Sequence, residues 1–197
     1  MTGSGAGPVA GPGRVAGPGR VAGAGRVREE ITVAGPDEMR ALGKRLAASL
    51  RPGDLVVLSG TLGAGKTTLV QGIGAGLGVR GPVTSPTFVI ARVHPPLAGG
   101  PALVHADAYR LASPAEVDDL DLDASLETSV TVVEWGGGLV EGLAADRLEI
   151  SIEVAAVTGR AVPGPDGGLD DLPRTVRLEG HGDRWQQEAI GRQASPH

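Results

Sequence analysis

A glycine-rich loop holds the first residues whose types and spacing suggest chemistry. Its letters, "GTLGAGKT" at residues 60–67, satisfy the pattern G-x-x-x-x-G-K-[ST]. Backbone N–H groups in such a loop can wrap a nucleotide phosphate, and its glycines permit the positive φ angles and close approach that this requires. Lys66 brings a compact charge to the β- and γ-phosphate oxygens, and the Thr67 hydroxyl can bind Mg²⁺. The chain has two lysines against sixteen arginines, so a lysine at this point indicates a phosphate site rather than a general need for charge.

The segments on either side of the loop have the character that a phosphate site needs. Residues 55–58 form a continuous apolar run, which predicts a buried strand. Residues 66–77 predict a helix that ends at Gly78, and its N-terminus would direct its positive end at the phosphate. Glycines 72, 74 and 76 each cost this helix about 1 kcal/mol relative to alanine, so we expect tight packing against the sheet to compensate. A strand, this loop and a helix in this order predict a site for ATP or GTP.

Two carboxylates stand at the ends of predicted strands, where α/β sheets place their ligands. Glu134 ends an apolar run and is expected to contact Mg²⁺. Asp107 ends another and is expected to orient the attacking water or to be an outer-sphere ligand of the metal. The plainer alternative for each is an acid that caps a strand or pairs with a nearby arginine. His105 is interpreted as structural, because phosphoryl transfer does not require a histidine.

Strands alternate with helices along the body of the chain. One helix is predicted to begin at Pro36 or Asp37, and another after Ser113 as its N-cap. Apolar and alternating runs predict strands within residues 29–35, 54–60, 87–93, 102–109, 129–135, 146–154 and 174–180. This order predicts an α/β fold, a P-loop NTPase-like three-layer sandwich with a mixed, partly parallel central sheet and helices on both faces.

Composition divides the chain into three parts. Residues 1–28 repeat "GPGRVA" and carry a charge of +4, and we predict a disordered Gly/Pro/Arg arm because no face of it could bury a core. Residues 29–180 are predicted to form the P-loop domain, and residues 181–197 a flexible tail that Trp185 could dock. The part of the chain after residue 28 carries a charge of −9, which argues against a broad nucleic-acid surface.

Signals for the membrane, for export and for disulfides are missing from the sequence. It contains no apolar run of 18 residues, no hydrophobic region of a signal peptide and no cysteine. We therefore expect a cytoplasmic protein without membrane association, disulfides or a thiolate metal site.

The choice of nucleotide follows from what the sequence lacks. GTPases of the usual kind read guanine with an [NT]KxD element, but this chain has no asparagine and neither Lys44 nor Lys66 lies in such a motif. ATP is therefore the expected nucleotide. Thr84, Ser85 and Thr87 lie in a proline-containing loop that could sense the γ-phosphate, as switch loops do.

Four segments in this order and spacing resemble the TsaE (YjeE) family. They are "GTLGAGKTTLVQGIGAGLGV", "VTSPTFVI", "VHADAYRL" and "VVEWGG", and the resemblance runs from about residue 31 to residue 160. It implies an ATPase of tRNA threonylcarbamoyladenosine (t6A) biosynthesis that hydrolyses ATP weakly alone. It also implies docking on a TsaB–TsaD pair, with tRNA reached only through that complex.

The resemblance implies roles for individual residues. Lys66 and Thr67 would bind phosphate and Mg²⁺, Glu134 would be the second contact to Mg²⁺, and Asp107 would serve hydrolysis. Trp135 would form a wall beside the nucleotide. The nucleotide-binding residues carried over are Pro36, Leu62, Gly63, Ala64, Gly65, Lys66, Thr67, Thr68 and Arg160. The sequence departs from the family at Met39, where threonine is common, and at Gly136, where proline is usual.

Two other functions remain open from the residues alone. A small-molecule kinase could use the same loop, with Asp107 as the base that deprotonates an acceptor hydroxyl, although no arginine-bearing lid is evident unless residues 160–180 supply it. A purely structural nucleotide-binding subunit would bind ATP without hydrolysing it.

Overall fold

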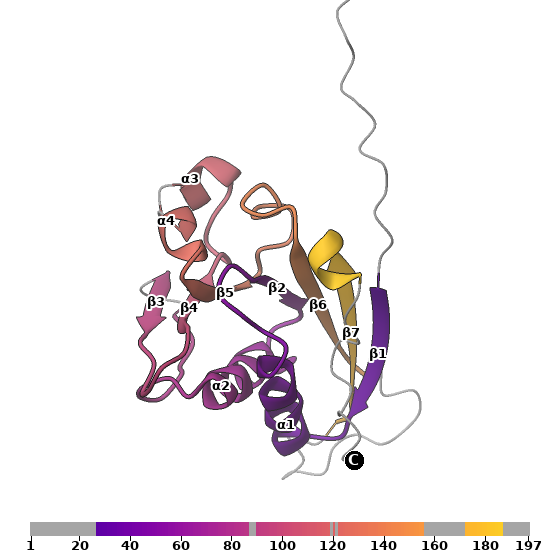
Figure 1. Cartoon of the computed structure of the whole chain (residues 1–197). Coiled ribbons are helices and arrows are strands. Elements are labelled where there is room, and N and C mark those ends of the chain that lie inside the picture. The colour runs from indigo at the N-terminus through magenta and orange to yellow at the C-terminus, as the bar shows by residue number, and fades with distance from the viewer. Residues whose placement is uncertain (1–26, 87–89, 119, 121, 156–171, 187–197) are drawn as a thin grey trace, which may run out of the picture.

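The structure is a computed structural model that describes residues 27–86, 90–118, 120, 122–155 and 172–186. Seven strands form one sheet in the order β1-β7-β6-β2-β5-β4-β3 (Figure 1). The strands are β1 (Val27–Val33), β2 (Leu55–Gly60), β3 (Ala91–His94), β4 (Ala102–Asp107), β5 (Ser129–Glu134), β6 (Arg147–Val154) and β7 (Arg174–His181). The helices are α1 (Pro36–Ala47), α2 (Lys66–Leu77), α3 (Pro114–Asp118), α4 (Leu122–Leu126) and the 3-10 turn η2 (Asp183–Trp185).

The middle of the sheet is parallel and its two sides are antiparallel. Strands β6, β2, β5 and β4 run in the same direction, whereas β3 pairs with β4, β7 with β6 and β1 with β7 in antiparallel fashion. The predicted α/β class with a mixed, partly parallel sheet is confirmed. The carboxyl ends of β2, β5 and β4 consequently meet at one edge of the sheet.

Alternate residues of β2 face two different hydrophobic cores. Val56 and Leu58 pack in the core that contains α1 and α2. Leu55 and Val57 pack in the core that contains α3 and α4. Side chains of a strand point alternately to the two faces of a sheet, so the helices form a layer on each side. Figure 1 shows α1 and α2 side by side, apart from α3 and α4.

Two of the three glycines of α2, Gly72 and Gly76, lie against α1. A Cβ atom added at Gly72 would lie 2.2 Å from the carbonyl oxygen of Arg40, and one at Gly76 would lie 2.4 Å from the Cβ of Ala47. Gly43 of α1 is equally confined, because its Cβ would lie 2.3 Å from the carbonyl oxygen of Leu69. Glycine therefore allows the two helix backbones to touch, which explains why α2 contains residues that disfavour a helix.

One strand boundary and one helix on the β4 side of the sheet differ from the predictions. Strand β3 begins only at Ala91, because Ile90 has a φ of 65° that bends the chain just before the strand. Residues 87–89 of the predicted strand lie outside the described residues. The short helix α4 was not predicted, since five residues are too few to show a helical period.

The folded domain extends past residue 180, where we expected a flexible tail to begin. Strand β7 runs to His181, and η2 places Trp185 in the core with no exposed surface. The Arg184 guanidinium pairs with Asp54 at 3.0 Å and donates a hydrogen bond to the carbonyl oxygen of Ser49 at 2.6 Å. Burial of the tryptophan ring and of this ion pair holds the segment on the sheet. The remainder of the tail and residues 1–26 lie outside the described residues.

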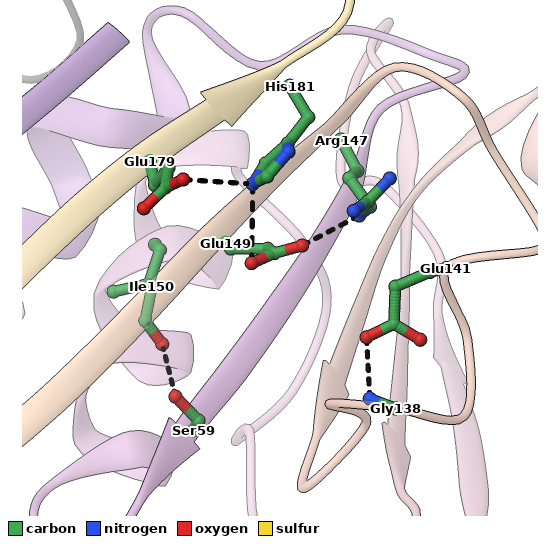
Figure 2. A network of polar contacts seen from close by, with 8 residues as sticks. All are labelled: Ser59, Gly138, Glu141, Arg147, Glu149, Ile150, Glu179 and His181. Carbon is green, nitrogen blue, oxygen red and sulfur yellow. Dashed lines mark hydrogen bonds and ion pairs between the residues drawn. The ribbon is translucent and has the colours of Figure 1, made fainter. Parts of the chain in front are cut away.

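A small polar network lies on β6 and β7, within the antiparallel side of the sheet (Figure 2). The Glu149 carboxylate accepts a hydrogen bond from Arg147 at 2.8 Å and lies 3.3 Å from His181 Nε2. Its neighbour on β7, Glu179, lies 3.7 Å from the same histidine nitrogen. The network links β6 to β7 and uses no residue of the predicted site.

None of the helices in the described ranges is long and apolar enough to cross a membrane.

Candidate functional site

The loop after β2 has the backbone shape that its glycines predicted. Gly60 has a φ of 145° and Gly65 a φ of 103°, both values that side chains disfavour. A Cβ atom on Gly60 would also lie 2.5 Å from the carbonyl oxygen of Ile152 on β6. The loop turns tightly against the neighbouring strand and delivers the chain into α2 at Lys66. The N–H groups of the first turn of α2 therefore open onto the space above the sheet.

Lys66 is folded back over its own loop. Its Nζ donates hydrogen bonds to the carbonyl oxygens of Gly60 at 2.9 Å and Thr61 at 3.0 Å, and lies 3.8 Å from the ring centroid of Trp135. Burial lowers the pKa of Lys66, and the charges of Glu134 and Asp107 oppose that shift. The two carbonyls, the aromatic face and two carboxylates thus hold the ammonium group at the entrance of the helix.

Thr67 and Glu134 meet although 67 residues separate them. The Thr67 hydroxyl donates to Glu134 Oε1 at 2.9 Å, and His105 Nε2 lies 2.9 Å from the same oxygen. A hydroxyl and a carboxylate this close suit Mg²⁺, which usually takes one or two protein oxygens and completes its shell with phosphates and water. No cluster of three or more His, Cys, Asp or Glu side chains suited to a metal is present in the described part of the chain. A metal here would therefore depend on oxygens supplied by a nucleotide.

Asp107 and Trp135 occupy the same edge of the sheet. Asp107 is directly opposite Glu134 in the register of β4 and β5, and its Oδ1 accepts a hydrogen bond from the backbone N–H of Tyr109 at 3.0 Å. Trp135 has a φ of 61°, so the chain turns sharply as it leaves β5. The ring of Tyr109 lies 5.2 Å from that of Trp135, centroid to centroid. The turn and the ring contact hold the indole above Lys66.

One cavity of about 320 Å³ joins these groups, and it is large enough for part of a nucleotide. The predicted residues that line it are Pro36, Leu62, Gly63, Gly65, Lys66, Thr67, Thr68, Asp107, Glu134 and Trp135. Ala64 does not line it, because its side chain is fully buried beneath the loop. Arg160 lies outside the described residues. Met39 and Ser85 complete the lining together with Arg174.

Arg174 is the residue that sequence reasoning missed. It begins β7, is almost fully buried, and donates from Nε to the carbonyl oxygen of Ala64 at 3.2 Å. In the alternating pattern of β7 it falls in step with the buried Val176 and Leu178. An arginine in phase with the apolar face of a strand was a signal of an interior role. Its charge therefore faces the phosphate loop from a strand far along the chain.

Comparisons with known proteins agree on one family. The family model described as "Threonylcarbamoyl adenosine biosynthesis protein TsaE" matches residues 33–162. The tRNA threonylcarbamoyladenosine biosynthesis protein TsaE of Streptomyces coelicolor is 61% identical over 148 residues, which are 75% of this chain and 93% of that protein. The protein of the same name from Bacillus subtilis is 40% identical over 64% of this chain and 78% of its own length. The crystal structure of YdiB from Bacillus subtilis superposes with a TM-score of 0.62 at 30% identity, covering 82% of this chain and 91% of YdiB.

Proposed function

The chain belongs to the TsaE family of t6A biosynthesis, and from this premise we propose that it binds ATP with Mg²⁺ at residues 60–67 and hydrolyses it. One observation carries the proposal: the Thr67 hydroxyl and the Glu134 carboxylate lie 2.9 Å apart in the same cavity as Lys66. A chain that merely kept a loop motif would not need a buried acid at that point. We place this activity in the cytoplasm.

Different residues of the chain bind the phosphates, hold the metal, orient the water and exclude bulk solvent. The amides of residues 62–67 and the Lys66 ammonium bind the phosphates, while Thr67 and Glu134 hold Mg²⁺ with the help of nucleotide oxygens. Bound Mg²⁺ supplies positive charge that offsets the charge of the phosphate oxygens. Asp107 orients a water molecule whose oxygen bonds to the γ-phosphorus as the bond from that phosphorus to the bridging oxygen breaks. One proton of the water stays on the phosphate and the other is released to solvent, and ADP and phosphate leave. Trp135 keeps bulk water away from Lys66.

A TsaB–TsaD-like complex is the partner that we propose for this ATPase. Leu62 at the tip of the loop is 87% exposed and Tyr109 is 65% exposed, and both lie by the cavity that Trp135 lines. Apolar side chains at the entrance of a site are suited to contact with another protein. Docking there would position Ser85, which lines the cavity, and raise hydrolysis, because phosphoryl transfer depends on positioning. Contact with tRNA would then be indirect.

Phosphate release tests the proposal. We expect slow, Mg²⁺-dependent release from the wild type, stimulation by TsaB–TsaD, and loss of release in Glu134→Gln and Lys66→Ala. Lys44→Ala is the matched control, because Lys44 is the only other lysine and is exposed on α1. Tight ATP binding without hydrolysis under any condition would instead indicate a structural subunit. Consumption of ATP only with a small hydroxylated metabolite would indicate a kinase.

A further inference from the structure

His105 is a buried histidine whose ring reaches the site from beneath. It lies on β4 with no exposed surface, and its Nε2 is 2.9 Å from Oε1 of Glu134. The same Oε1 accepts the hydrogen bond of the Thr67 hydroxyl at 2.9 Å. The Glu134 carboxylate is itself only 3% exposed. Its orientation is therefore set by two protein donors rather than by water.

The other ring nitrogen shows which tautomer the site requires. Nδ1 of His105 is buried, and among the described residues it has no hydrogen-bond partner. A buried N–H without an acceptor costs about 1–3 kcal/mol, so a proton on Nδ1 would be unfavourable. A ring that carries its proton on Nε2 avoids this cost and donates that N–H to Glu134. A histidine in this tautomer is a fixed donor aimed at one carboxylate oxygen.

We propose that His105 is a positioning residue for the magnesium site, an inference that rests on the proposed function. Its Nε2–H holds Oε1 of Glu134 next to the Thr67 hydroxyl, so that the two metal-side oxygens are already together before the nucleotide arrives. Donors behind a metal ligand fix its orientation, and their loss typically reduces metal affinity or activity by about 10–100-fold. His105 is not among the residues that line the cavity, and it acts through Glu134.

A second buried histidine offers a comparison within the same sheet. His94 lies on the neighbouring strand β3 and is 4% exposed. Its Nε2 has no hydrogen-bond partner among the described residues. If a buried histidine served only packing, replacing either residue with leucine would affect stability alone. Only His105 has a carboxylate of the site within hydrogen-bond distance, so only its replacement should affect the metal.

The experiment measures ATP binding by the full chain as a function of Mg²⁺ concentration, with His105→Leu, His105→Gln and His94→Leu beside the wild type. In His105→Leu we expect the half-saturating Mg²⁺ concentration to rise by about 10-fold or more, while ATP affinity in EDTA stays within about 2-fold. His105→Gln should restore most of the wild-type Mg²⁺ response, because its amide can donate to Oε1. His94→Leu should respond like the wild type. Thermal unfolding of each variant separates a loss of fold from a loss of metal binding.

A spectroscopic readout on the wild type keeps the inference testable if His105→Leu does not fold. The ¹⁵N shifts of the imidazole should show that Nε2 carries a proton. A proton on Nδ1 instead would overturn the inference, since Nε2 could not then donate. An unchanged Mg²⁺ response in a folded His105→Leu variant would also overturn it while the proposed function stands. If wild-type ATP binding itself does not respond to Mg²⁺, the proposed function fails, and this inference fails with it.

Discussion

The contact between α1 and α2 makes an unusual prediction for Gly72, because two effects of opposite sign compete there. Alanine is favoured over glycine inside a helix by about 1 kcal/mol, so Gly72→Ala would stabilise α2 in isolation. In the folded protein the added Cβ would lie 2.2 Å from the carbonyl oxygen of Arg40 and 2.9 Å from its Cα. Both atoms belong to the backbone of α1, so no side-chain rotation relieves the collision.

The size of the effect follows from the movement that is needed. Ordinary contacts of a Cβ atom begin at 3.4 Å, so α1 must move by about 1 Å although Leu42 and Leu46 anchor it in the core. Overpacking of a tight core costs about 1–3 kcal/mol and occasionally more. We take the upper end because the collision is with backbone, and after the gain in helix propensity we expect a net loss of about 2 kcal/mol. The melting temperature should fall by about 4–8 °C.

Urea unfolding followed by circular dichroism measures this loss. Gly74→Ala is the comparison within the same helix, because the three atoms nearest to its Cβ belong to the side chains of Val83, Val79 and Leu103. These side chains can move more easily than backbone, so a smaller loss is expected. Gly142→Ala controls for the substitution itself, since its Cβ meets nothing within 4 Å. If Gly72→Ala raised the free energy of unfolding by about 1 kcal/mol, as in an isolated helix, the argument that the two backbones touch would be refuted.

Three further predictions concern the C-terminal segment and the site. Asp54→Ala should lower the free energy of unfolding by about 3–5 kcal/mol, because it removes the carboxylate that pairs with the buried Arg184 guanidinium. A change below 1 kcal/mol in urea unfolding would contradict this. The change in tryptophan fluorescence on addition of ATP should persist in Trp185→Phe and vanish in Trp135→Phe, since Trp135 lines the cavity whereas Trp185 is fully buried in the hydrophobic core. ATP affinity should fall as the pH rises toward 10. Burial lowers the pKa of Lys66 below 10.5, so its positive charge is lost at a lower pH than that of an exposed lysine. An affinity that stays constant up to pH 10.5 would contradict this.

Several features of the fold were predictable because neighbouring residues encode them. The continuous apolar run of β2 and the alternation in β6 each identify a strand by its own side chains. A phosphate loop is identified within eight consecutive residues, 60–67, by its glycines, Lys66 and Thr67. Strand β3 and helix α4 were not predictable to the same degree. One is only four residues long, the other five, and neither shows a full period.

The C-terminal segment shows a different kind of limit. The segment after residue 180 is short and mostly polar, which is typical of a flexible tail. Trp185 nevertheless packs in the core, because Arg184 finds Asp54 and the carbonyl oxygen of Ser49 about 130 residues earlier. Burial of one aromatic ring and formation of one ion pair stabilise a folded segment where the local sequence is typical of a tail. No window of sequence around residue 185 contains those partners.

By itself, the sequence determined the phosphate loop, the strand and helix that flank it, the order of the four motifs and hence the family. Each of these depends on residues that are neighbours along the chain. Only the tertiary structure decided that His105 and Thr67 both contact Oε1 of Glu134, that Arg174 faces the loop, and that Gly72 and Gly76 of α2 lie on α1. Those contacts depend on the strand order β7-β6-β2-β5-β4 and on the pairing of Asp107 with Glu134. Strand pairing between distant segments is chosen by the burial of the whole core, which leaves no local period in the sequence from which it can be read.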